Sequence, residues 1–206
     1  MILDFYYRLL ELYGEQHWWP NKSGMRWEIL AGAILVQNTA WSNVERTLTN
    51  LENAGLMAPE RVLSMPDCDL RELIRPSGFF QAKCAYLKAL AAFFLDHEGE
   101  LLQSEDVPAL RRQLLAVNGV GKETADDILL YAFQKPIFVI DAYTRRVATR
   151  HLGIDGTLPY EELQKTFMEA LPQDVQLYGE YHALFLALCK DSCRKNGCGA
   201  TCQHLQ

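Results

Sequence analysis

The residues between Val117 and Asp126 have the types and spacing of a phosphate-binding turn. Two glycines flank a small apolar residue, and a helical pattern begins directly after them. Glycine permits a positive φ and leaves backbone amides uncovered, and the helix N-terminus adds the positive end of its dipole. The turn therefore predicts contact with a phosphate backbone. The residues expected to make that contact are Gly119, Val120, Gly121, Lys122 and Thr124.

One carboxylate stands out after this turn. Asp141 lies twenty residues beyond Gly121 and is a candidate for chemistry beside the backbone that the turn holds. It also has a structural interpretation, because an Asp three residues before Thr144, ahead of a helical pattern, is an ordinary N-cap. The two roles are compatible, so both remain open.

Cysteines are concentrated at the end of the chain. Four of the six fall within the last eighteen residues, separated by three, four and three residues: Cys189, Cys193, Cys198 and Cys202. Such clustering in an intracellular chain indicates metal binding rather than disulfides. Four thiolates suit either a 4Fe-4S cluster or a tetrahedral zinc ion, and free thiols are the remaining alternative.

The elements that must position these groups are helices. Apolar residues recur at intervals of three and four within eight segments, separated by proline and glycine. These segments are 2–14, 25–36, 43–54, 79–95, 107–117, 124–133, 159–171 and 174–189. The run from Ile137 to Ile140 resembles a strand, but four apolar residues between two helices favour a buried connection. The expected fold class is all-α.

Composition indicates a protein of the cytoplasm. The chain has 206 residues, 49% of them hydrophobic, and no apolar stretch long enough for a membrane span. Its first residues lack the basic start of a signal peptide. The net charge of −6 argues against nucleic acid, but residues 111–150 carry seven basic and four acidic side chains, a local charge of +3. The excess of acidic side chains therefore lies outside residues 111–150, which contain the turn. We expect a monomer that is associated with the nucleoid when bound to DNA.

Four stretches in the same order resemble the helix-hairpin-helix DNA glycosylases of the endonuclease III superfamily. The first is Leu35 to Thr39, and the second is the Gly-aromatic-x-x-x-Lys loop from Gly78 to Lys83. The third is the turn and its helices with the following Asp141, and the fourth is the cysteine-rich C-terminus. Together they span nearly the whole chain.

The resemblance implies a fold of two helical lobes that binds double-stranded DNA. Residues 21–135 would form a helical barrel domain that ends in the hairpin, and residues 1–20 with 136–206 would form the second domain. Gln37 and Lys83 are then expected to contact DNA, with the glutamine probing the base stack. Among four-thiolate centres the family favours the 4Fe-4S cluster, although the cysteine spacing here differs from the family's usual one.

The resemblance also implies cleavage of an N-glycosidic bond. This reaction builds positive charge on the sugar, and a fixed carboxylate such as Asp141 stabilises that charge or accepts a proton from the attacking water. Members that also cut the strand carry a lysine at the second position after the hairpin's last glycine, where this chain has Glu123. We therefore expect a monofunctional enzyme that uses water, with Glu123 as a second candidate carboxylate.

The alternative interpretations of the hairpin differ in chemistry. Lys122 stands one residue earlier, and one residue turns a helical side chain by about 100°, so it is expected to point elsewhere. Were Lys122 to act as the amine, the enzyme would be a bifunctional glycosylase and lyase of the endonuclease III type. Were Asp141 inactive, the chain would be a non-catalytic DNA-binding protein.

Aromatic residues suggest the type of base. The region Trp18-Trp19-Pro20 and the ring of Trp41 resemble those of the 3-methyladenine glycosylase branch, in which they line the base pocket. A flipped base stacks on aromatic rings, and a cationic alkylated base gains most from an electron-rich face. Core packing is the alternative for each tryptophan, and at least one of Trp18 and Trp19 is expected to be purely structural.

Overall fold

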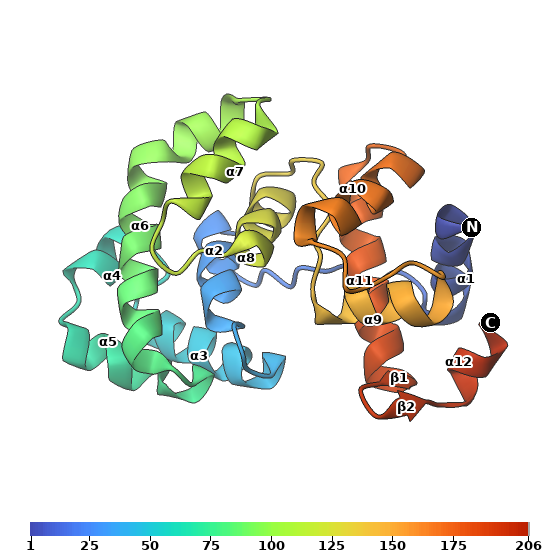
Figure 1. Ribbon diagram of the computed structural model, residues 1–206. Helices are drawn as coiled ribbons and strands as arrows, with labels where there is room; N and C mark the ends of the chain where they lie inside the picture. The colour runs from blue at the N-terminus through green and yellow to red at the C-terminus, as the bar shows by residue number, and fades with distance from the viewer. Residues whose placement is uncertain (206) are drawn as a thin grey trace. The chain divides into compact units, whose positions relative to one another are not determined.

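The computed structural model describes residues 1–205 and is helical almost throughout (Figure 1). The predicted all-α fold class is confirmed. The chain divides into two compact units: a hairpin unit, Asn21–Lys135, and a terminal unit, Met1–Pro20 with Pro136–Gln206. Within residues 1–205, no helix is both long and apolar enough to cross a membrane.

The hairpin unit is built around one buried helix, α2 (Arg26–Leu35), in which every residue from Trp27 onwards is buried. Helix α2 packs against α3 (Trp41–Asn53), α6 (Phe80–Gln103) and α8 (Lys122–Asp127). The remaining elements of the unit are α4 (Pro59–Ser64), α5 (Asp67–Ile74), the short η1 (Arg75–Ser77), α7 (Val107–Leu115) and η2 (Ile128–Ala132). The π-helical η2 continues α8 directly.

Two short helices of this unit are absent from the sequence-based expectation. Helix α4 begins at Pro59 and α5 is preceded by Pro66, and both prolines had been interpreted only as breaks. Proline is tolerated in the first turn of a helix because its missing N–H has no intrahelical partner there. Helix α6 also extends to Gln103, beyond the expected end at residue 95.

The terminal unit encloses an aromatic core around α11 (Val175–Asp191). This helix packs against α1 (Ile2–Tyr13) and α9 (Ala142–His151), while α10 (Tyr160–Ala170) contacts α1. The rings of Phe138 and Phe167 stack 4.7 Å apart, with Tyr181 and Phe185 beside them. The buried connection predicted for Ile137 to Ile140 is confirmed, since none of these residues belongs to a strand and all are buried.

The C-terminal cysteine segment is not a plain loop. It forms a two-stranded antiparallel ribbon, β1 (Cys193–Arg194) with β2 (Gly197–Cys198), followed by the short α12 (Ala200–His204). In the ribbon Cys193 lies directly opposite Cys198. The segment therefore has its own backbone geometry, which brings two of the cysteines together.

Candidate functional site

The hairpin between α7 and α8 depends on a glycine that no other residue can replace without strain. Gly119 has φ = +86°, and a Cβ at this position would overlap the ring of Tyr86 on α6. Gly121 is different: it has φ = −89°, caps the N-terminus of α8, and has open space around a Cβ. The first glycine therefore fixes the turn, and the second leaves its outer surface uncovered.

Polar contacts hold the two helices of the hairpin in place. Arg111 of α7 donates to both carboxylate oxygens of the fully buried Asp126 of α8, at 2.6 and 3.2 Å. From the end of α2, the Gln37 amide donates to the Gly119 carbonyl and the Thr124 hydroxyl, each at 3.0 Å. Gln37, which was expected to probe the base stack, therefore has its amide nitrogen bonded to the hairpin itself.

Lys83 is the clearest correction to the expected DNA contacts. Only 1% of the residue is exposed, and its Nζ donates to the carbonyls of Leu35, at 2.8 Å, and Ser77, at 2.7 Å. These carbonyls lie at the ends of α2 and η1, where the last backbone carbonyls have no hydrogen-bond partner within the helix. Burial lowers the pKa of Lys83 to about 8. The ammonium thus joins two helix ends inside the unit and does not face DNA.

The other predicted contact residues of the hairpin divide into an outer and an inner group. Gly121 and Lys122 are exposed at the start of α8, and so is Glu123, the second candidate carboxylate. Val120 and Thr124 are buried, so their side chains support the turn from inside. Only the exposed group, together with the backbone of the turn, is placed to meet a ligand.

Asp141 occupies the N-cap of α9 and has a buried histidine beside it. Its Oδ1 accepts a hydrogen bond from the Thr144 N–H at 2.6 Å, and its Oδ2 lies 3.5 Å from Nε2 of His182 on α11. Asp141 and His182 are 8% and 5% exposed. The capping interpretation of Asp141 is therefore correct. The cap uses Oδ1 and leaves Oδ2 facing the imidazole of His182.

The surroundings of Asp141 favour its charged form. Burial alone raises the pKa of a carboxyl group, but here His182 and the Thr144 N–H outweigh it, and the pKa of Asp141 lies below its ordinary value. Asp141 is therefore a carboxylate at neutral pH. A buried negative charge of this kind can stabilise positive charge that develops on a bound sugar.

The tryptophans predicted to line a base pocket are all partly exposed. Trp18 and Trp19 lie in the terminal unit with their ring centroids 5.3 Å apart, and the ammonium of Lys190 stands 5.9 Å from the Trp18 ring. Pro20 follows them, also partly exposed, and Trp41 begins α3 in the hairpin unit. Because none of these rings is fully buried, their use in a base pocket stays a prediction.

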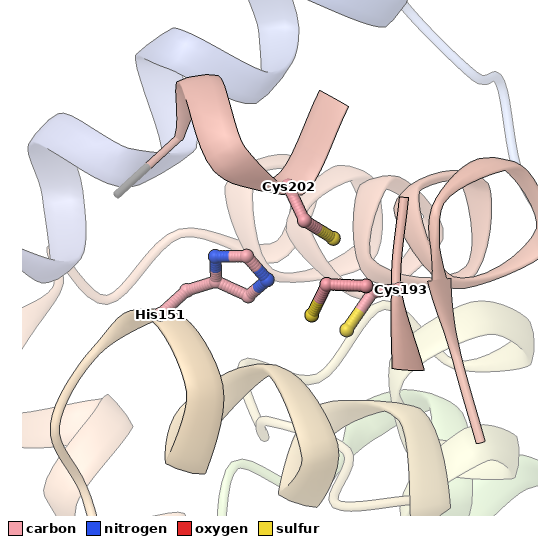
Figure 2. A group of neighbouring side chains, drawn as sticks. His151, Cys193 and Cys202 are labelled. Atoms are coloured by element: carbon pink, nitrogen blue, oxygen red, sulfur yellow. The ribbon is translucent and has the colours of Figure 1, made fainter. Parts of the chain in front are cut away.

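The structure groups a histidine with three of the four C-terminal cysteines. The ligand atoms of Cys193, Cys198, Cys202 and His151 all lie within 4.8 Å of one another, a group that could hold a metal ion. Figure 2 shows the His151 ring and the thiols of Cys193 and Cys202 directed at the same space. Cys189, expected as the first ligand, is buried in α11 and is not part of this group.

Two histidines therefore take part in groups that no local sequence pattern indicates. His182 lies in an apolar helical segment, where a packing histidine is the more frequent case, and the partners of His151 stand far along the chain. Phe79 is a third addition, since the residue is 69% exposed and has φ = +46° in the Gly-aromatic loop. Its exposure could not be read from an apolar sequence pattern.

Comparison with known proteins gives one family and several relatives. Residues 31–173 match the family described as HhH-GPD superfamily base excision DNA repair protein. A provisionally named DNA repair glycosylase of Methanocaldococcus jannaschii is 43% identical over 206 residues, covering 98% of this chain and 93% of that protein. Endonuclease III of Thermotoga maritima is 28% identical over 71% of this chain and 66% of its own length.

Solved structures show the same fold. The H. pylori 3-methyladenine DNA glycosylase MagIII, bound to 1,N6-ethenoadenine, has a TM-score of 0.77 and 29% identity, covering 92% of this chain and 95% of that one. A non-covalent endonuclease III–DNA complex has a TM-score of 0.82 at 19% identity, covering 99% and 92%. At that identity the second likeness concerns the fold alone.

Replacing the two glycines of the hairpin separately tests its geometry. Gly119→Ala is expected to lower the free energy of unfolding by at least about 2 kcal/mol, because alanine must adopt a left-handed conformation and displace Tyr86. The matched variant Gly121→Ala is expected to cost less than about 1 kcal/mol, the scale of a lost N-cap preference. Chemical denaturation measures both, and equal losses would contradict this account of the turn.

The ionisation of Asp141 predicts a particular dependence of stability on pH. Since its folded pKa lies below the ordinary value, its contribution is complete above about pH 4 and is lost as the pH falls through the folded pKa. The difference in unfolding free energy between wild type and Asp141→Asn should therefore be largest at neutral pH and shrink on acidification. Denaturant titrations at a series of pH values measure it, and a difference that grows on acidification would be inconsistent with a charged Asp141.

Proposed function

The chain belongs to the HhH-GPD superfamily of base excision DNA repair proteins, and from this premise we propose that it is a monofunctional DNA N-glycosylase. Its proposed substrate is duplex DNA that carries an alkylated, 3-methyladenine-like base. The enzyme flips this base from the stack and hydrolyses its glycosidic bond. The observation that carries the proposal is the buried, ionised carboxylate of Asp141 at the N-terminus of α9.

Asp141 acts in this proposal mainly through its charge. As the glycosidic bond breaks, the sugar gains oxocarbenium character, and a fixed carboxylate with few waters around it stabilises that state. The pKa of Asp141 lies below its ordinary value, so the group is a weak proton acceptor and a permanent negative charge at neutral pH. The attacking water loses its proton to this carboxylate or to solvent only as the new bond forms.

His182 is a positioning residue in this scheme. Its Nε2 stands 3.5 Å from Oδ2 of Asp141, while the N-cap bond from Thr144 holds the other oxygen. The two contacts come from different elements, α11 and α9, and restrict rotation of the carboxylate. A carboxylate has room for further acceptor contacts beyond these two, so the site can still interact with substrate.

Glu123 supports hydrolysis by water. Strand-cutting relatives need an amine at this position to form a Schiff base, and a carboxylate cannot form one. Glu123 is exposed in the first turn of α8, where the helix dipole favours a negative charge. We propose it as an auxiliary carboxylate that acts on the water or on the extruded nucleotide.

The preference for an alkylated base rests on two observations. At 29% identity and nearly full coverage, the chain is similar to a 3-methyladenine glycosylase whose structure holds an ethenoadenine. Three tryptophans, Trp18, Trp19 and Trp41, are also partly exposed, as residues that line a base pocket would be. A cationic base would gain from aromatic faces and would already be a good leaving group.

DNA binding is proposed to use the backbone of the hairpin and the exposed start of α8. Uncovered amides next to a helix N-terminus favour a phosphate, and the Arg111–Asp126 pair keeps the two helices aligned for it. Phe79, exposed in its loop, is proposed to contact the bases, since apolar side chains inserted at a base step stabilise a distorted duplex.

The relatives named endonuclease III support a second candidate function. In it the enzyme would also cut the strand, with Lys122, exposed at the start of α8, as the attacking amine. Lys122 stands one residue from the position that the family uses, which is the reason why hydrolysis is preferred here.

A metal centre at the C-terminus completes the proposal. The endonuclease III relatives support a 4Fe-4S cluster, whereas the ligand spacing in this chain supports a smaller centre. In either case the centre lies at the opposite end of α9 from Asp141, about 15 Å away along ten residues, so its proposed role is to anchor that helix.

Asparagine at position 141 separates charge from capping. Asn caps helices as well as Asp, so Asp141→Asn should fold, but its single-turnover rate constant on a 3-methyladenine duplex should fall by about 100-fold or more. Asp174→Asn provides the matched control, because it makes the same change at the exposed N-cap of α11. That control should keep wild-type rates, and an Asp141→Asn enzyme as fast as wild type would favour a non-catalytic role for this carboxylate.

Borohydride trapping tests the nucleophile. Reduction of a Schiff base leaves a covalent enzyme–DNA adduct, so wild type is expected to give none on any duplex that it processes. Glu123→Lys places an amine at the family's position and is expected to yield trapped adduct. An adduct with wild type that disappears in Lys122→Ala would instead establish the bifunctional enzyme.

A further inference from the structure

The cysteine-rich ribbon and the last residue of α9 form one compact set of ligands. Three thiols, from Cys193, Cys198 and Cys202, converge with the imidazole of His151, and every pair of ligand atoms lies within 4.8 Å. All of these cysteines are free thiols. We propose that this set binds a single zinc-type divalent ion through three sulfurs and one nitrogen, and that His151 takes the place expected for a fourth cysteine.

The spacing of the ligand atoms suits one ion. Around tetrahedral zinc, with Zn–S bonds of about 2.3 Å, the ligand atoms stand about 3.8 Å apart. In a 4Fe-4S cluster each thiolate binds a different iron at the outside of the core, so the sulfurs must stand much farther apart than around one ion. A group confined within 4.8 Å can close on a single ion by small side-chain rotations, whereas a four-iron core would require the sulfurs to move apart.

The intervals between the cysteines in the sequence also favour zinc. Cys193 and Cys198 are separated by four residues and face each other across the β1–β2 ribbon, and Cys202 follows after three more. Structural zinc sites draw cysteine pairs from such short intervals, and three cysteines with one histidine are among their common ligand sets. Iron–sulfur clusters of the four-iron type are held by four cysteines.

His151 has the properties of a ligand with no other task. Neither of its ring nitrogens finds a hydrogen-bond partner within residues 1–205, although both atoms are buried. Its ring stacks on Phe5 of α1 with the centroids 5.6 Å apart, which fixes its orientation. An unsatisfied buried nitrogen is costly, and coordination of an ion removes that cost for the nitrogen that binds it.

The surroundings of the sulfurs complete the site. Arg150 directs Nη1 at the sulfurs of Cys193 and Cys198, at 3.7 and 3.8 Å, and donates to the carbonyls of Arg194 and Lys195. Three thiolates with one divalent ion carry a net negative charge, which this guanidinium offsets. Gly199 lacks the Cβ that would crowd the Ser192 hydroxyl, and this hydroxyl accepts the Cys202 N–H at 3.2 Å.

Metal and sulfide analysis of the purified protein tests the proposal directly. One zinc per chain, no acid-labile sulfide and a colourless protein are expected. About four irons and four sulfides per chain with broad visible absorption would overturn it. A protein that retains no metal after incubation with zinc under reducing conditions would overturn it as well.

Two variants identify the fourth ligand. His151→Ala should weaken zinc retention in a competition with a chelator by about 100-fold or more, while Cys189→Ser should retain zinc as wild type does. The reverse pattern would show that the four cysteines are the ligands. His151→Cys, which restores a ligand, should recover retention.

Cobalt substitution keeps the test decisive if His151→Ala fails to fold. Wild type loaded with Co²⁺ should give the absorption of a tetrahedral ion with three thiolates, and Cys189→Ser should give the same spectrum. A spectrum of four thiolates that falls to three in Cys189→Ser would contradict the assignment of His151.

Discussion

The proposed chemistry depends on one short helix, α9, and on the carboxylate that caps it. The Thr144 N–H and the neighbouring His182 hold Asp141 as a charged group in a buried place. The buried connection from Ile137 to Ile140 leads the chain to this point, and the aromatic core around α11 fixes the partner histidine. A single hydrogen-bonded cap therefore begins the helix and also orients the charge that we propose for the glycosidic reaction.

The hairpin shows a different way of fixing a functional backbone. Gly119 lies against the ring of Tyr86, Gln37 bonds its carbonyl, and Arg111 with Asp126 joins the two flanking helices. Removing one partner of a buried ion pair strongly destabilises a protein, because the other charge is left buried without a partner. The turn is thus held from inside its own unit, and its outer surface stays uncovered for the proposed contact with phosphate.

Local features could be predicted from the sequence, and features set by distant partners could not. The hairpin, the cap at Asp141 and the all-helical pattern follow from neighbouring residues, since glycine pairs, capping residues and periodicity act over a few positions. Lys83 and Gln37 have the polar side chains of surface residues. In the structure their side-chain nitrogens donate hydrogen bonds to backbone carbonyls that the fold brings near. His151 is the strongest example, because its sulfur partners come from a ribbon far along the chain. Helices α4 and α5 were missed for another reason: proline breaks the interior of a helix but is tolerated at or directly before its first residue.

The most direct measurement of the central claim is the state of the DNA strand after one turnover on a 3-methyladenine duplex. Samples quenched over time are divided, and one half is treated with alkali before electrophoresis. A monofunctional enzyme predicts that released base equals the alkali-revealed breaks and that the untreated strand stays intact. Strand breaks that appear without alkali, at the same rate as base release, would contradict hydrolysis by water and point to an amine as the nucleophile.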